Sequence, residues 1–250
     1  MPGRVNLLRA GATLWLSMYR RSKAALAALL VRPYLVLLFM IALGNSESIA
    51  LKALLSLLVT SAVDALWDIA GGAVNRRLMG ILPYEVLAPY SLPEVLLLTY
   101  LPRYLLETLL KFAELAPLMV LGGATPLQLA AALALGLLGA LPLASIGMLL
   151  ASLTLLAKED APWIDWTIPL LLILSGAVYP VTALPGLVRA VSALLPTTYL
   201  FELAEAAARG GSDWPLLLAA LFATASASWT ASLGVSRGIE RVTVRRGGHL

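Results

Sequence analysis

The sequence predicts an all-α integral membrane protein: six transmembrane helices, an N-terminal interfacial amphipathic helix, and a re-entrant helical pair between helices five and six. Three observations support this fold class. The 250 residues are 60% hydrophobic and only 13% charged, against about 25% charged in soluble proteins. Basic residues gather near both ends, and three prolines interrupt a late hydrophobic stretch. We expect one transmembrane domain over 1–250, with a cytoplasmic interfacial helix at 1–23, the bundle at 24–234 and a cytoplasmic tail at 235–250.

The composition also excludes several kinds of chemistry. The chain has no cysteine, and its single histidine is the penultimate residue, His249. Disulfides, thiolate sites and histidine metal clusters are therefore excluded, and we expect no catalytic, cofactor or metal site in this chain. The net charge is +4, but in a membrane protein the location of the charges matters more than their sum. We expect the lipid bilayer as a partner, and no nucleic acid.

The N-terminal stretch 5–21 has the pattern of an amphipathic helix lying in the membrane interface. Its polar residues recur at spacings of three or four, as do its apolar ones: Asn6, Arg9, Thr13, Ser17 and Arg20 on one track, and Val5, Leu8, Ala12, Trp15 and Tyr19 on the other. Basic residues precede the first span and follow the last. Because basic loops stay in the cytoplasm, both termini are predicted inside, which requires an even number of spans.

Hydrophobic runs predict the six spans at 24 or 33 to 44, 49–67, about 101–121, 126–156, from 163 and 213–234. The segment 71–102 is too interrupted by proline and glycine to cross as one helix, although 92–101 can begin the third span. For the remainder of this segment we expect either a short cytoplasmic helix at 83–88, which contains Glu85, or an unstructured connector. Lys52 is expected to snorkel to the surface. Asp64 and Asp68 share a helix face, and we interpret them as interface caps or partners of Arg76 and Arg77.

The third span carries an intramembrane charged stripe, which we define as Arg103, Glu107, Lys111 and Glu114. Spacings of four, four and three place these side chains on one helical face. A charge at mid-bilayer costs about 2.5–3.5 kcal/mol on insertion scales, so the stripe must pair or face water. Structural ion pairing is the favoured interpretation, and lining of a transport path is the alternative. In the fourth span, small residues repeat at Ala132, Gly136, Ala140 and Ala144, a pattern that favours close helix packing.

The segment 169–199 begins as a membrane helix and is then interrupted at Pro180, Pro185 and Pro196. Proline restricts the residue before it and lacks an N–H, so helices are expected to end near all three. Non-helical backbone at membrane depth survives only inside protein or at a cavity, which favours a re-entrant pair over an ordinary apolar loop. With the termini inside, this pair lies at the outer face and can act as an external gate. Arg189 is its charge, with Glu202 and Glu205 as expected partners. The gate residues are Tyr179, Pro180, Leu184, Pro185, Arg189, Pro196 and Tyr199.

The sequence lacks the motif of an ATP-binding site. A phosphate loop requires glycine directly before its lysine, but Lys23, Lys52, Lys111 and Lys158 follow Ser22, Leu51, Leu110 and Ala157. A serine hydrolase would also need an internal histidine as its base, and the single histidine of this chain is the penultimate residue. A transporter with this sequence therefore needs its ATPase on another chain.

The order of these features resembles the permease subunit of an ABC-2 type ATP-binding-cassette exporter, over nearly the whole chain. The most specific part is similar to the family pattern of Ser-Gly, aromatic-Pro, Leu-Pro, an apolar helix, and a second Leu-Pro before Tyr. Here these are Ser175, Gly176, Tyr179, Pro180, Leu184, Pro185, Leu195, Pro196 and Tyr199.

The resemblance implies a multi-pass protein of a prokaryotic plasma membrane, without catalysis of its own. By the same resemblance, the chain is expected to assemble with a second permease copy or paralogue. Separate ABC ATP-binding subunits, which hold ATP and Mg, are expected to complete the assembly. The substrate leaves along the permease interface. The N-terminal helix and the loops 71–93 and 157–161 would dock the ATPase. The docking candidates are Arg9, Arg20, Arg21, Arg76, Arg77, Glu85, Lys158 and Glu159.

Two other classes remain open from the residues alone. An ion-coupled secondary transporter or channel would use the charged stripe as its ion path. An intramembrane lipid-handling enzyme would use Asp64, Glu107, Lys111 or Glu114 as catalytic groups. The substrate is not encoded in any recognisable motif.

Overall fold

The computed structural model describes residues 2–43, 48–80, 91–156 and 163–245, and every regular element within these ranges is a helix. The predicted all-α class is confirmed. In chain order the elements are α1 (Pro2–Arg21), α2 (Lys23–Ala42), α3 (Ile49–Leu66), the π-helical turn η1 (Trp67–Gly71), α4 (Gly72–Leu78), α6 (Leu92–Leu121), α7 (Pro126–Leu138), α8 (Ala140–Leu156), α9 (Trp163–Leu174), the 3-10 turn η2 (Val181–Ala183), α10 (Gly186–Ser192), α11 (Pro196–Arg209) and α12 (Trp214–Arg245).

Four helical stretches of the described chain are long and apolar enough to cross a membrane, or five if the bent pair α10–α11 counts as one span. The four are Lys23–Ala42, Ile49–Leu78, Pro126–Thr154 and Trp214–Val235. The second stretch runs through η1 and α4, so its helix ends later than the predicted residue 67. With 12 residues, α9 is about 18 Å long at about 1.5 Å per residue, which is shorter than the hydrocarbon core of about 30 Å.

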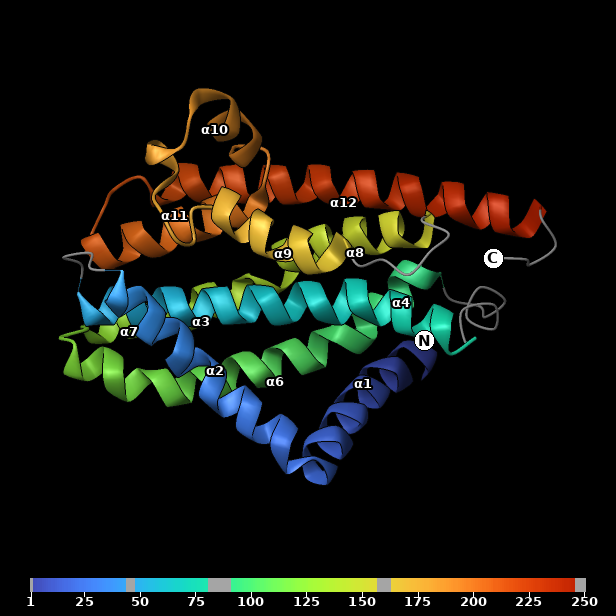
Figure 1. The fold of residues 1–250 in the computed structure, drawn as a ribbon, viewed down its shortest axis with the longest axis horizontal. Coiled ribbons are helices and arrows are strands. Elements are labelled where there is room, and N and C mark those ends of the chain that lie inside the picture. Colours follow the sequence, from blue (N-terminus) through green and yellow to red (C-terminus); the bar gives the residue numbers. More distant parts are fainter. Residues whose placement is uncertain (1, 44–47, 81–90, 157–162, 246–250) are drawn as a thin grey trace.

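The long helices lie roughly side by side, and α1 and α2 form a V whose tip points away from the bundle (Figure 1). The start of α1 and the end of α12 lie at the same end of the molecule. The starts of α3 and α7 lie at the opposite end, and α11 is also nearer to that end (Figure 1).

The core is built around α3, which is buried on all of its faces. Every residue from Leu51 to Ala62 is buried, including the polar Lys52, Ser56 and Thr60. A helix that is apolar all round belongs in the interior, where neighbours cover each face. The hydroxyl of Ser56 donates to the carbonyl of Pro33 in α2 (2.5 Å) and the hydroxyl of Thr60 donates to the carbonyl of Ser56 (2.8 Å). These bonds satisfy polar groups that would otherwise be costly in the core.

The third predicted span lies in one continuous helix of 30 residues, α6, which begins at Leu92 and includes the stretch 92–101 that could begin this span. Pro93 lies in its first turn, where the missing N–H costs nothing, and the helix ends at Gly122 and Gly123, the latter with φ +85°. The small-residue face of the fourth span is buried, as expected for close packing. A Cβ on Gly136 would lie 3.0 Å from Thr108 of α6, so α7 and α6 approach closely.

Each of the three predicted proline breaks coincides with a helix boundary. Pro180 precedes η2, Pro185 precedes α10, and Pro196 is the first residue of α11. α10 and α11 meet at 93°. Gly176, with φ +82°, makes the turn after α9.

Candidate functional site

Three of the four stripe residues form a buried charge network between α6 and α3. Lys111 Nζ lies 2.6 Å from Asp64 Oδ2, and the other oxygen of Asp64 pairs with Arg32 of α2. One turn away, Arg103 pairs with Asp68 (2.8 Å) and Glu107 (2.9 Å). Lys111 is 1% exposed and Glu107 3%. Three cations and three anions balance one another, which is what a low-dielectric interior requires.

The interpretation of Asp64 and Asp68 as partners of Arg76 and Arg77 was wrong. Arg76 is eight residues beyond Asp68, about 12 Å along the helix at about 1.5 Å per residue, and its guanidinium donates instead to the hydroxyl of Thr99 (3.2 Å). Asp64 and Asp68 lie on the side of their helix that packs against α6, where they pair with Lys111 and Arg103. Arg32, which lies beside Pro33 inside α2, was not expected in the site.

The N-terminal helix is attached to this network through two aromatic side chains. Trp15 Nε1 and the Tyr19 hydroxyl both donate to Glu107 Oε1, at 3.0 and 2.8 Å. Their rings are in contact, with centroids 5.0 Å apart. Burial, and then the charge and hydrogen bond of Glu107, raise the pKa of Tyr19 above its ordinary value. The hydroxyl therefore keeps its proton and remains a donor.

α1 therefore packs along α6. Its amphipathic pattern predicted a helix in the membrane interface but did not predict this packing partner. Arg4 pairs with Glu94 at the start of α6 (2.5 Å), and a Cβ on Gly11 would lie 2.5 Å from the backbone oxygen of Thr99. The predicted apolar track is largely correct, since Leu8, Ala12, Trp15 and Tyr19 are partly buried, but Val5 is 63% exposed. The spacing of Trp15 and Tyr19 by four residues was the signal that could have suggested a shared acceptor.

Glu114 is different from the rest of the stripe. Both oxygens of its carboxylate are buried and have no hydrogen-bond partner within the described part of the chain. The Tyr34 hydroxyl of α2 donates to its backbone carbonyl (3.2 Å) and not to its side chain. Glu114 therefore lies on the stripe by register but outside the ion-pair network.

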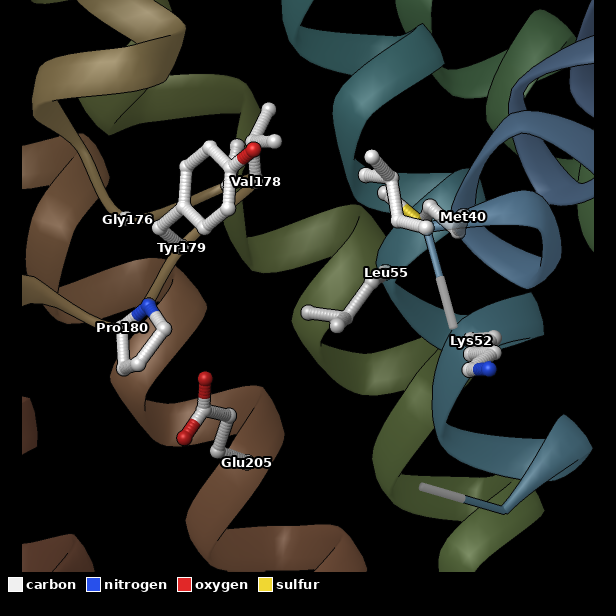
Figure 2. Close-up of a pocket in the computed structure, with 10 residues that line it drawn as sticks. Met40, Lys52, Leu55, Gly176, Val178, Tyr179, Pro180 and Glu205 are labelled. Carbon is white, nitrogen blue, oxygen red and sulfur yellow. The ribbon is translucent and has the colours of Figure 1, made fainter. Parts of the chain in front are cut away.

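A small pocket separates the end of α2 and the start of α3 from the segment after α9 (Figure 2). Tyr179 and Pro180 line one side, Lys52 lies on α3, and Glu205 lies on α11. Its volume is about 30 Å³, room for about two waters, so no larger solute fits. Lys52 is 7% exposed, so neighbouring residues of the bundle cover its side chain, and its expected snorkelling to a membrane surface stays a prediction.

Side-chain bonds to the backbone hold the bent segment together. Arg189 donates to the carbonyls of Thr182 (2.5 Å) and Leu184 (3.5 Å), so the expected pairing with Glu202 or Glu205 was wrong. Glu205 instead pairs with Arg209, four residues later and one turn along α11.

Further bonds connect the three short elements. Tyr199 donates to the carbonyl of Ala193 (2.9 Å), Thr198 donates to that of Ser192 (2.7 Å), and the hydroxyls of Ser175 and Thr197 are bonded to each other. Among the gate residues, Pro185 and Tyr179 are exposed, and Pro196 is buried. The segment is thus ordered by hydrogen bonds among its own residues.

The predicted docking residues are scattered over the end where α1 begins and the tip of the α1–α2 V. Arg9, Arg20 and Arg21 are exposed on α1, and Arg76 and Arg77 lie on α4, partly buried. Glu85, Lys158 and Glu159 lie outside the described residues.

No protein-family model matches the chain, and no curated protein matches it either. Within the described ranges, no group of three or more His, Cys, Asp or Glu side chains could hold a metal ion.

Proposed function

We propose that this chain is the permease subunit of an ATP-driven exporter of the ABC-2 type. The observation that supports this best is the late segment of η2, α10 and α11, whose elements begin at or directly after the three prolines of the family-like pattern. The missing phosphate loop in the sequence agrees with an ATPase encoded on a separate chain.

In this proposal six spans cross the membrane: α2, α3 with α4, α6, α7 with α8, α9 with the following re-entrant pair, and α12. The start of α1 and the end of α12 share one end of the bundle (Figure 1), which agrees with an even number of crossings. That end carries Arg76 and Arg77, so it faces the cytoplasm by the positive-inside rule. The protein belongs to the plasma membrane of a prokaryotic cell.

The ATPase subunit docks on the cytoplasmic end and on the exposed basic residues of α1, Arg9, Arg20 and Arg21. Its ATP-driven closure moves α1, and the bonds of Trp15 and Tyr19 to Glu107 transmit this movement to α6. Through Arg103 and Asp68 the same movement reaches η1, a π-helical turn of a kind that often marks functional sites. The substrate crosses at the interface of two permease chains, and the small pocket under Tyr179 and Pro180 is the closed state of the external gate.

Co-purification tests the assembly directly. The tagged chain is expressed with ABC ATPase subunits of its own genome, extracted in mild detergent, and assayed for a bound ATPase and for ATP turnover. Reversing the charges of Arg20 and Arg21 to glutamate should reduce ATPase binding. Arg189→Glu, at the opposite end, is the matched control and should leave binding intact. A chain that remains stable and solitary, with no stimulated ATP turnover, would refute the proposal.

An ion-coupled transporter is the second candidate, and Glu114 is the observation that favours it. A buried carboxylate with no partner within the described residues, next to a charge network, is a typical feature of a proton or ion path. Transport that survives ATP depletion and collapses with the ion gradient would support this candidate over the exporter. Glu114→Gln should then abolish coupling at normal protein abundance.

A further inference from the structure

An apolar cavity of about 520 Å³ lies between α7, α11 and the start of α12. Half of its lining residues are alanines and glycines, which leave space between the three helices: Ala131, Ala134, Ala206, Ala207, Gly210 and Gly211. Leu127, 79% exposed, and Trp214, 56% exposed, also line it at the ends of their helices. The cavity is distinct from the charge network and from the small pocket at the gate.

The cavity has the length of one leaflet of a bilayer. Its lining residues on α7 run from Leu127 to Leu138, which is about 16 Å at about 1.5 Å per residue. Half of a hydrocarbon core of about 30 Å is about 15 Å. The cavity therefore begins at the end of the bundle where α7 starts and reaches the middle of the proposed membrane.

Toward the middle of the bundle, the lining of the cavity on α7 ends at Leu138. Beyond Leu138 the chain continues as α8, which lies along α12 (Figure 1). The buried side chains of Leu135 and Leu203 form part of the lining. A helix of a second chain would cross both leaflets, whereas this cavity spans only one. Water is also a poor occupant, because apolar cavities stay dry and take apolar guests.

The rim has the groups that suit a lipid headgroup. Trp214 lies where aromatic residues gather at membrane–water interfaces. Arg209, next to the lining residue Gly210, has a side chain that is 59% exposed, and its contact with Glu205 is 3.5 Å long. A guanidinium at this level is within the region where lipid phosphates lie, and Arg is suited to bidentate phosphate contacts.

We infer that this cavity binds one acyl chain of a phospholipid from the leaflet on the α11 side, with the headgroup beside Arg209 and Trp214. The inference rests on the proposed membrane embedding and not on the ATPase partner. A bound chain would fill the space between α7, α11 and the start of α12. The lipid is therefore an integral part of the structure behind the gate segment.

The first test needs no variant. Native mass spectrometry of the intact chain, extracted in mild detergent, should detect one retained phospholipid per chain. Delipidation should lower the thermal stability of the chain, and phospholipid added back should restore it. No retained lipid, together with unchanged stability after delipidation, would overturn the inference while leaving co-purification with an ATPase unaffected.

The second test locates the lipid. The chain is placed in nanodiscs that contain a phospholipid with a photoreactive diazirine in its acyl chain, irradiated, and digested. Label should concentrate in the peptides covering 127–138 and 203–218. Ala134→Phe with Ala206→Phe fills the cavity and should lower this labelling about tenfold, a loss equivalent to about 1.4 kcal/mol of binding.

The matched control is Ala223→Phe, at an exposed position of α12 outside the cavity, which should leave labelling unchanged. Equal labelling in all three proteins would overturn the inference. So would efficient disulfide formation between two chains carrying Ala134→Cys, since a second copy would then occupy the cavity.

Discussion

Replacement of Lys111 by methionine should destabilise the protein, because it removes the most deeply buried charge of the network. The ammonium is 1% exposed and lies 2.6 Å from Asp64. Removal of one partner of a buried pair costs about 3–5 kcal/mol, since the other charge stays buried without compensation. We expect about 3 kcal/mol, the lower limit, because Arg32 still pairs with the other oxygen of Asp64. Methionine keeps the unbranched chain, so the change is mainly one of charge.

Thermal unfolding in detergent measures this loss. For a chain of about 150–250 residues, 1 kcal/mol shifts Tm by about 2–4 °C, so Lys111→Met should lower Tm by about 6–12 °C. Lys23→Met removes an exposed lysine and is the control. Asp64→Leu with Lys111→Met should lose about 1–3 kcal/mol less than the sum of the two single changes. Strict additivity, or a Lys111→Met chain as stable as Lys23→Met, would refute the pairing.

Three further predictions concern α1 and the gate. Gly11→Leu should lower stability by about 1–3 kcal/mol, because its Cβ would lie 2.5 Å from the Thr99 oxygen; Gly72→Leu, which meets nothing within 4 Å, is the control in the same Tm assay. Gly176→Ala should cost about 1–2 kcal/mol, because φ is +82° and the new methyl group would lie 2.8 Å from Val181, whereas Gly186→Ala has open space; equal Tm values would contradict this. The Tm difference between wild type and Tyr19→Phe should be constant from about pH 6 to 9. The pKa of Tyr19 is raised above its ordinary value of 10.0. The contribution of Tyr19 to stability is therefore complete below that value and is lost only as the pH rises through the folded pKa. A difference that shrinks within this range would show that Tyr19 loses its proton early.

Local patterns were sufficient to predict the helical class and the breaks of the late segment. Prolines act on their own backbone and the residue before it, so Pro180, Pro185 and Pro196 indicated the breaks of the late segment without any knowledge of its neighbours. The 3–4 residue spacing likewise placed Arg103, Glu107 and Lys111 on one face of α6. The start of α6 was left open between residues 92 and 101, because prolines often interrupt helices, whereas Pro93 and Pro102 are both accommodated within this helix.

The partners of the charges could not be predicted in the same way. Asp64 and Asp68 were assigned to the nearest arginines along their own helix, but their partners come from α2 and α6. Arg189 was assigned to carboxylates of the next helix, but it donates to carbonyls within its own turn. An ion pair depends on which helix faces meet, and that is a property of packing and not of spacing.

The sequence by itself has a composition typical of membrane proteins. It also determined the helical spacing of side chains, the positions of the proline breaks and the presence of a charged stripe that must pair or face water. These follow from interactions within a few residues of the chain. Only the tertiary structure decided that α1 is attached to Glu107 through Trp15 and Tyr19, that Glu114 lies outside the network, and that small residues of α7 and α11 leave an apolar cavity. Each of these depends on residues far apart in the chain, whose side chains meet only when the helices pack.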